Sequence, residues 1–282
     1  MASFEETQVV PTELLIARVM QIHASVSKLE SLRPSKPINT LLTQLVKLCS
    51  LPSSIEISTL PNEVQLIRQS LIKLCGIAEG FLELEFSTFL TNVPHPLNHL
   101  DLFPYYNNYV LLAGLEHNIL AENGVEQPKK VAFIGSGPLP LTSIIMATHH
   151  MQTTYFVNID IDESANHVAG QIVGSDLELE RRMKFETFDV MEVKEMLEEF
   201  DIIFLAALVG MSKEEKGKII AHLRKYMKAG GVLLVRSANG ARAFLYPAVE
   251  EEDLEGFEVL SIFHPTNEVI NSIVLARKPM FG

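Results

Sequence analysis

Short apolar segments alternate with helical ones over the second half of the chain, and this alternation constrains the fold more than any other feature. Five segments have strand character and are separated by stretches of helical spacing: 130–134, 153–160, 184–188, 201–206 and 231–236. Alternating strands and helices form a parallel sheet with helices on both faces. Two further strands, at 257–263 and 270–276, have no helix between them. We therefore expect an α/β fold whose mostly parallel seven-stranded sheet ends in an antiparallel hairpin.

The first 120 residues follow a different pattern. Apolar residues recur at three- and four-residue spacing, which predicts helices, in four segments: 12–30, 39–49, 61–89 and 106–122. The character changes at Gln127-Pro128. We expect a helical N-terminal domain over residues 1–124 and a Rossmann-like domain over 125–282, with the reaction in a cavity between them because pockets favour such interfaces.

Composition and charge narrow the class of partners. The chain has 23 Lys and Arg against 35 Asp and Glu, a net charge of −12, and this acidic balance disfavours nucleic acid. No apolar run reaches the roughly 20 residues that a membrane helix needs. Glu5 and Glu6 precede the first basic residue, Arg18, unlike a targeting peptide. Cys49 and Cys75 are too few for a disulfide framework. We expect a cytoplasmic protein with a small-molecule substrate.

The segment Ile134–Pro138 (IGSGP) has the form of a nucleotide-binding turn. A buried strand runs into a Gly-x-Gly sequence, where the backbone turns sharply, approaches a ligand and offers the free amides of a helix N-terminus. Pro140 stands where a dinucleotide fingerprint needs a third glycine. This departure favours a ligand without a pyrophosphate, such as S-adenosylmethionine. A tight structural turn is the alternative.

Carboxylates follow the next two strands. Asp160 comes 25 residues after Gly135, at a strand end where an acid accepts hydrogen bonds from both ribose hydroxyls, whereas Asp162 suits a helix N-cap. Asp189 follows the third strand, where it can reach an adenine amino group or cap a helix over 191–199. Because adjacent strand ends form one crevice, these features resemble the Rossmann-like class I fold of S-adenosylmethionine-dependent methyltransferases.

A more specific resemblance covers nearly the whole chain. Four strings are similar to those of plant nicotianamine synthases: FPYYNNY (103–109), IGSGPLPLT (134–142), FLAALVGM (204–211) and RSANGARAFLYP (236–247). The resemblance implies that S-adenosylmethionine is both cofactor and building block, with no metal. Three molecules are joined by two aminocarboxypropyl transfers and one ring closure to an azetidine, and three methylthioadenosines leave.

The resemblance also implies site residues. Glu83 and Tyr109 correspond to the family's catalytic glutamate, which grips the substrate amine and takes its proton, and to its site tyrosine. Without the resemblance, the sequence pattern favours a solvent-exposed helix position for Glu83 and a packed aromatic side chain for Tyr109. Glu79, one turn earlier on the same helix face, is the reserve candidate. Nucleotide contacts are expected from Gly135, Ser136, Gly137, Pro138, Asp160, Asp189 and Ala206.

The residues themselves, apart from the resemblance, suggest substrate contacts. Arg236 and Arg242 flank the loop after the fifth strand, where they can bind a substrate carboxylate bidentately or remain surface residues. Tyr246 in the same segment can shape the pocket wall, and Tyr106 belongs to an aromatic cluster that covers the ligand or packs in the core.

The chemistry of the ligand leaves two other functions open. A sulfonium makes all three attached carbons electrophilic, and the protein selects one by placing the nucleophile behind it. A nucleophile aimed at the methyl carbon gives a small-molecule N-methyltransferase instead. A paralogue that only binds S-adenosylmethionine is the other alternative, because fold does not determine function.

Overall fold

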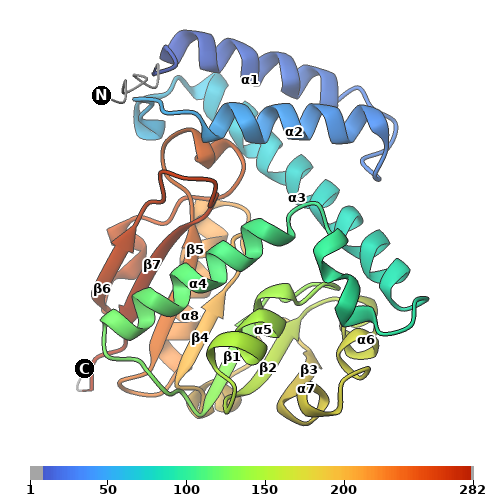
Figure 1. Cartoon of the computed structure of the whole chain (residues 1–282). Coiled ribbons are helices and arrows are strands. Elements are labelled where there is room, and N and C mark those ends of the chain that lie inside the picture. Colours follow the sequence, from blue (N-terminus) through green and yellow to red (C-terminus); the bar gives the residue numbers. More distant parts are fainter. Residues whose placement is uncertain (1–8, 281–282) are drawn as a thin grey trace, which may run out of the picture.

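The computed structural model describes residues 9–280 (Figure 1), so Glu5 and Glu6 lie outside the described residues. Its α-helices are α1 (Thr12–Val26), α2 (Lys36–Ser50), α3 (Asn62–Leu90), α4 (Tyr106–Glu122), α5 (Leu141–Ile145), α6 (Glu163–Val173), α7 (Leu177–Arg182) and α8 (Lys213–Tyr226). Its strands are β1 (Lys130–Ile134), β2 (Tyr155–Asp160), β3 (Met183–Thr187), β4 (Ile202–Leu205), β5 (Val232–Ser237), β6 (Glu258–Phe263) and β7 (Ser272–Arg277).

The strands form one seven-stranded sheet in the order β3-β2-β1-β4-β5-β7-β6. Strands β1 to β5 pair in parallel, whereas β7 runs antiparallel to both β5 and β6. The expected mostly parallel sheet with an antiparallel C-terminal hairpin is therefore confirmed, and β6 is the edge strand. This arrangement brings the carboxyl ends of β1, β2, β4 and β5 to the same edge.

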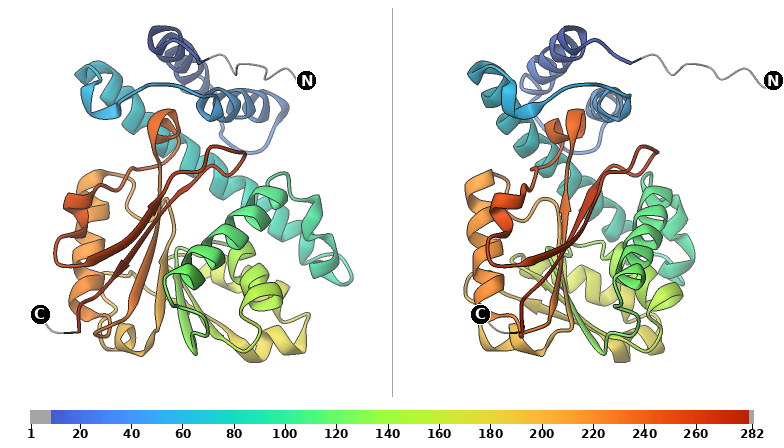
Figure 2. Two further views of the ribbon diagram at one scale, coloured as in Figure 1. Left: turned by 60° about the vertical axis from the view of Figure 1, so that its left-hand side comes forward. Right: turned by 90° about the vertical axis from the view of Figure 1, so that its left-hand side faces the viewer.

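Alternation along the strands divides the core into two layers. In β1, Val131 and Phe133 join an apolar cluster with α4 and α5, whereas Ala132 and Ile134 join a second cluster with α8. Successive side chains of a strand point to opposite faces, so each buried strand supplies both layers. Figure 2 shows the result, with α8 on one side of the sheet and α4 on the other.

Helices α1 to α3 lie across the end of the sheet rather than on its face (Figure 2). Leu15, Leu45 and Leu71, one from each helix, pack with Phe244 in the short 3-10 helix η5 (Gly240–Phe244), which follows β5. Helix α3 begins directly after Pro61 and continues past this cluster to contact α6. One face of α3 is thereby held over the carboxyl ends of the strands.

The helix expected over 191–199 is wrong. After β3 the backbone closes turns from Glu192 to Asp189 and from Val193 to Val190, and only Glu195–Glu199 forms a 3-10 helix, η4. These are three-residue closures, which do not propagate an α-helix. The domain division at residue 124 stays a prediction: α4 packs on the sheet, and the cluster that joins α1 to α3 also contains Phe244 from the segment after β5.

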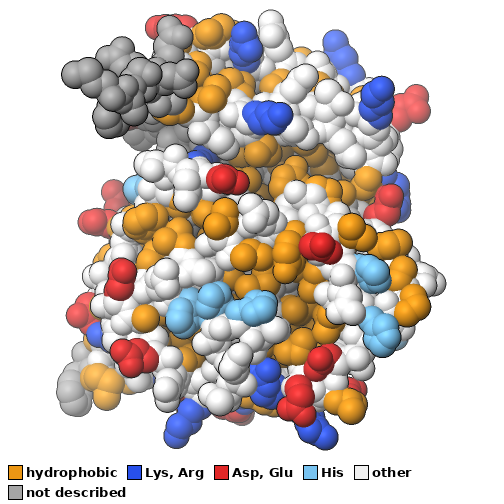
Figure 3. All heavy atoms as spheres, in the orientation of Figure 1, with side chains coloured by type: hydrophobic (Ala, Val, Ile, Leu, Met, Phe, Trp, Pro, Cys, Tyr) orange, Lys and Arg blue, Asp and Glu red, His pale blue; other side chains and the backbone are white. Residues whose placement is uncertain are grey.

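On the face shown in Figure 3, charged side chains of one sign do not gather into a patch that would suit a charged partner. Lys and Arg side chains are dispersed there, and acidic side chains lie between them. None of the described helices is both long and apolar enough to cross a membrane.

Candidate active site

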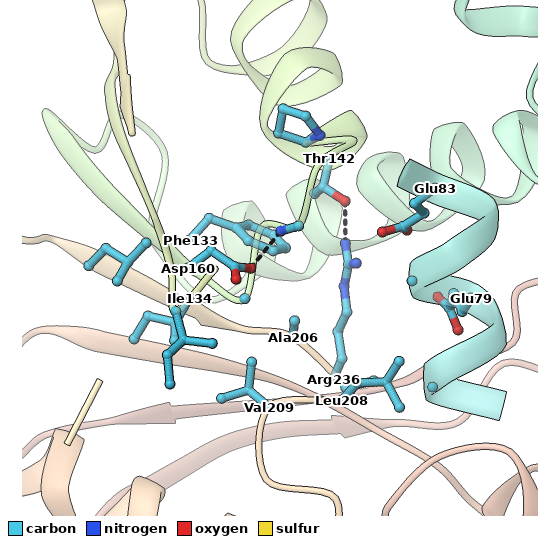
Figure 4. A pocket seen from close by; sticks show the side chains of 18 of the residues that line it. Glu79, Glu83, Phe133, Ile134, Thr142, Asp160, Ala206, Leu208, Val209 and Arg236 are labelled. Carbon is cyan, nitrogen blue, oxygen red and sulfur yellow. Dashed lines mark hydrogen bonds between the residues drawn. The ribbon is translucent and has the colours of Figure 1, made fainter. Parts of the chain in front are cut away.

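A cavity of about 430 Å³ lies where α3 faces the carboxyl ends of the strands (Figure 4). The loop after β1 forms one wall, the segments after β2, β3 and β4 form the next, and α3 closes the opposite side. Ten of the thirteen expected site residues line this cavity: Glu83, Tyr109, Gly135, Gly137, Pro138, Asp160, Asp189, Ala206, Arg236 and Tyr246.

The loop after β1 needs its glycines. Gly135 and Gly137 have φ angles of 79° and 64°, a left-handed conformation that other residues rarely adopt. A Cβ at position 135 would collide with the Val209 side chain, and one at position 137 would lie 3.0 Å from Oε2 of Glu83. The second contact shows how closely the carboxyl group on α3 approaches the glycine loop.

Asp160 ties this loop to the end of β2. Its Oδ2 accepts the amide of Gly137 at 2.8 Å, and its Oδ1 accepts the amide of Asp162 at 3.0 Å. The predicted capping role of Asp162 is confirmed, because its side chain accepts from the amides of Ser164 and Ala165 at the start of α6. Asp189 borders the same cavity and accepts the amide of Met191 at 2.9 Å. The carboxylates of Asp160 and Asp189, which line the cavity, are therefore each held in orientation by backbone amides.

Glu83 and Tyr109 meet across the cavity wall. The Tyr109 hydroxyl donates to Oε1 of Glu83 at 3.0 Å. Burial, reinforced by the nearby Glu79 carboxyl, raises the pKa of Glu83 to about 8. Burial also raises the pKa of Tyr109 well above its usual value, so its hydroxyl stays a donor. A carboxyl group with a raised pKa in an enclosed site is suited to accept a proton near neutral pH.

Glu79 forms a second pair of the same kind. The Tyr246 hydroxyl donates to Oε2 of Glu79 at 3.0 Å, and burial raises the pKa of Glu79. Glu79 and Glu83 are four residues apart and therefore share one face of α3. Figure 4 shows both side chains on this helix beside the cavity.

Arg236 lines the cavity from β5, but its guanidinium is already paired. Nε and Nη2 donate to the two carboxylate oxygens of Glu116 at 2.7 and 3.0 Å. Nη2 also donates to the Thr142 hydroxyl at 2.7 Å (Figure 4). The group lies 5.3 Å from the centre of the Phe133 ring. The bidentate carboxylate partner expected from a substrate is thus supplied by Glu116 of the chain itself.

Three expected site residues do not line the cavity. Arg242 donates to the backbone carbonyls of Pro265 and Asn267, because the turn after β5 directs it toward the loop between β6 and β7. Tyr106 packs against the core cluster of the α4 layer. Ser136 is buried, and its hydroxyl has no hydrogen-bond partner among residues 9–280. The expected contacts of Tyr106 and Arg242 with substrate do not fit these positions.

Two buried charged residues near the cavity escaped the sequence analysis. Glu116 interrupts the buried face of α4 between Leu112 and Ile119, and a charge on an apolar helix face was the available signal. Lys216 is fully buried, and its Nζ donates to the carbonyls of Ala206 and Ala207 at 2.9 Å each. No sequence pattern indicated that Lys216 is buried, because it lies in a highly charged helix.

The number of N–H donors on a neutral Lys216 amine equals the number of carbonyl groups that accept from it. Burial lowers the pKa of Lys216 to about 7. A neutral amine has two N–H donors, which the two carbonyls satisfy, whereas an ammonium has a third. Lys216 thereby anchors Ala206 and Ala207, two residues of the cavity wall, from behind.

No group of three or more His, Cys, Asp or Glu side chains in the described part of the chain is placed to hold a metal ion. The cavity is lined by carboxyl groups, hydroxyls and backbone amides together with apolar side chains. Such a site can bind a cationic amino acid, hold its amine against a carboxylate and accept a proton.

The family model described as "Nicotianamine synthase protein" matches residues 7–281. The nicotianamine synthase of Solanum lycopersicum is 53% identical over 264 residues, which cover 94% of this chain and 83% of that protein. Nicotianamine synthase 3 of Arabidopsis thaliana is 54% identical over 269 residues, covering 94% and 84%.

Solved structures share the fold at lower identity. A glutamate-to-glutamine mutant of MtNAS in complex with S-adenosylmethionine has a TM-score of 0.77 at 21% identity, covering 94% of this chain and 98% of that chain. MtNAS in complex with MTA and tNA has a TM-score of 0.77 at 21% identity, covering 94% and 97%. The profile match and the identity to plant relatives give one conclusion: the chain belongs to the nicotianamine synthase family.

Proposed function

We propose that the cavity condenses three S-adenosylmethionine molecules into nicotianamine, with Glu83 and Tyr109 at the reacting amine. Membership of the family makes the chain a transferase that uses S-adenosylmethionine as its substrate. One observation carries the assignment of residues. The Glu83 carboxyl lies against the glycine loop at Gly137 and accepts the Tyr109 hydroxyl at the same time.

The nucleotide end of the substrate belongs, in this proposal, on the sheet side of the cavity. Gly135 and Gly137 open the loop to a ligand, and Asp160 ends β2, at the place where ribose hydroxyls are usually held. Asp189 and Ala206 border the remaining edge, toward the adenine. The amino acid end then points toward α3, where Glu83 stands.

Each transfer forms one C–N bond and breaks one C–S bond. The α-amine of one molecule attacks the γ-carbon of the next molecule's aminocarboxypropyl arm, and the C–S electron pair returns to sulfur. Methylthioadenosine leaves as a neutral thioether, and one proton is released from the amine. Ring closure is the same step within one molecule. Three bonds therefore release three methylthioadenosines and three protons.

The environment of Glu83 suits this proton. An α-ammonium cannot attack until it loses a proton, and a surface carboxylate is too weak a base to take it. Burial raises the pKa of Glu83 to about 8, which brings it near that of an amine. The Tyr109 hydroxyl, 3.0 Å away, orients the carboxyl group.

The test replaces Glu83 while keeping its shape. Glu83→Gln retains an amide of the same size that cannot accept the proton, so methylthioadenosine release should fall by roughly 10²- to 10⁴-fold. Affinity for S-adenosylmethionine, measured by calorimetry, should change only a few-fold. Glu85→Gln is the matched control, because Glu85 is exposed on the same helix. Parallel losses of affinity and turnover would assign Glu83 to the architecture of the site instead.

The proposal extends to the setting of the enzyme. A cytoplasmic location is supported by Cys49 and Cys75, which are free, buried thiols. A role in metal ion homeostasis would follow from the product, since the family's product chelates metals. We place the boundary between the helical domain and the Rossmann-like domain at residues 124–125, between the end of α4 and the start of β1.

A further inference from the structure

The buried amine of Lys216 holds the loop that follows β4 from the side opposite the cavity. Its Nζ donates to the carbonyl oxygens of Ala206 and Ala207, which line the cavity, at 2.9 Å each. Lys216 itself is 0% exposed and lies behind them in α8. None of the salt bridges within residues 9–280 includes Lys216. A lysine is rarely buried without an acidic partner, so the two carbonyls account for its position.

The two carbonyls fix the direction of the amides in the same peptide units. None of the described peptide bonds is cis, and a trans unit places its N–H opposite its C=O. The amides of Ala207 and Leu208 therefore face away from Lys216, toward the cavity that both residues line. Neither amide has an acceptor among residues 9–280, whereas the amides on either side, of Ala206 and Val209, donate to backbone carbonyls. Two successive free amides beside a cavity indicate an acceptor that arrives with a ligand.

The ligand of the family carries one group for which the side chains of the cavity offer no free cation. S-adenosylmethionine ends in an amino acid, and its carboxylate needs hydrogen-bond donors wherever water is excluded. Arg236 is the one basic residue among the described residues that line the cavity, and Glu116 already occupies its guanidinium. Successive backbone N–H groups form anion-binding sites in many proteins. The free amides of Ala207 and Leu208 are therefore suited to this carboxylate.

These amides lie where the loop crosses from the sheet to α3. A Cβ built at Gly135 would lie 3.2 Å from the Cβ of Ala206, and one built at Gly76 on α3 would lie 3.3 Å from Cδ2 of Leu208. Figure 4 shows the Leu208 side chain beside α3 and Ala206 farther from that helix. The loop thus leads from the glycine loop, beside the nucleotide, to the helix at which the amino acid end is placed.

We propose that Lys216 is a positioning residue that turns the amides of Ala207 and Leu208 into the cavity, where they bind the α-carboxylate of S-adenosylmethionine. The inference deepens the proposed function and rests on its placement of the amino acid end toward α3. Lys216 does not touch the ligand. Its two hydrogen bonds keep the peptide units from rotating, so the positive end of each peptide dipole stays directed at the carboxylate.

The experiment separates the carboxylate from the rest of the ligand. Calorimetry measures the binding of S-adenosylmethionine, of its decarboxylated analogue and of methylthioadenosine, in a Glu83→Gln background that limits turnover during the titration. Lys216→Met fills a similar space without donors. It should weaken S-adenosylmethionine by at least about tenfold, because hydrogen bonds to a charged group are stronger than neutral ones. The other two ligands have no carboxylate, so their affinities should change only a few-fold.

A matched control and a coupling measurement make the comparison specific. Lys218→Met removes a lysine that is exposed on the same helix and paired with Glu214, so it should leave all three affinities unchanged. Without a change at Lys216, removal of the ligand's carboxylate should itself weaken binding by about tenfold or more. In Lys216→Met the same removal should have little effect, because two changes that act through one interaction are not additive.

The outcomes separate the positioning role from a structural one and from the proposed function. An equal loss of affinity for all three ligands, or no loss, would overturn the proposal, because a purely structural role does not distinguish the carboxylate. If Lys216→Met does not fold, NMR on the Glu83→Gln protein decides. S-adenosylmethionine, but not its decarboxylated analogue, should slow deuterium exchange at the amides of Ala207 and Leu208, and equal slowing by both would overturn the proposal. Wild-type protein that binds S-adenosylmethionine in this way but releases no methylthioadenosine would instead overturn the proposed function.

Discussion

The basicity of the Glu83 carboxyl group depends on its burial. Burial raises the pKa of Glu83 to about 8, and the hydrogen bond from Tyr109 opposes part of that rise. The carboxylate is the form that holds an ammonium and accepts a proton, so activity is lost as pH falls through this pKa. We expect kcat/KM to fall about tenfold per pH unit below pH 8 and to level off above it.

A control separates this residue from titration of the substrate amine. Tyr109→Phe removes the hydrogen bond that favours the charged form, so the inflection should move to higher pH. The amine of free S-adenosylmethionine titrates equally with both proteins. An inflection at the same pH in both would show that the profile does not report Glu83.

The ion pair beneath the cavity makes a separate prediction about stability. Arg236 and Glu116 are 6% and 0% exposed, and their side chains form a bidentate pair. Glu116→Ala leaves the guanidinium buried and unpaired, which should lower the free energy of unfolding by about 3–5 kcal/mol. Thr142→Val, which removes one hydrogen bond, should cost about 1 kcal/mol. Chemical denaturation measures both, and equal effects would contradict this ranking.

At the scale of elements, the loop after β1 is the part whose shape matters most for the ligand. Gly135 has a positive φ, and a Cβ there would meet the Val209 side chain. Left-handed backbone costs other residues about 1–2 kcal/mol, and the loop must also move away from Val209. Gly135→Ala should therefore weaken S-adenosylmethionine binding at least tenfold, measured by calorimetry.

Helix α4 supplies a matched glycine for comparison. Nothing lies within 4 Å of a Cβ built at Gly114, which is in the helix interior. Gly114→Ala should leave binding unchanged and raise the free energy of unfolding by about 0.5–1 kcal/mol. Normal binding by Gly135→Ala would mean that this loop does not position the nucleotide.

Elements were predictable from sequence where local signals agree. The observed strands begin and end within two residues of the expected ones, because each combines an apolar run with nearby turn residues. Helix α3 starts after Pro61, and Gly124 follows α4 with a positive φ of 76°. The helix predicted over 191–199 was wrong. An acidic stretch with periodic apolar residues is compatible with a helix, yet the backbone there closes three-residue turns.

At the scale of the whole molecule, the site is assembled from segments far apart in the chain. Glu83 and Tyr109 were assigned through resemblance, and their contact spans 26 positions. Glu116 and Arg236 are separated by 120 positions, and Glu79 and Tyr246 by 167. Local periodicity carries no information about such pairs. The role of Lys216 likewise depends on packing, which only the three-dimensional structure contains.

The central claim is that the cavity transfers the aminocarboxypropyl arm and not the methyl group. Purified protein would be incubated with S-adenosylmethionine alone, in one sample labelled in the methyl carbon and in another along the aminocarboxypropyl arm. We predict that mass spectrometry finds the methyl label only in methylthioadenosine and the arm label in an azetidine product, with three methylthioadenosines per nicotianamine. Unreacted substrate, or S-adenosylhomocysteine with the methyl label on another molecule, would contradict the account.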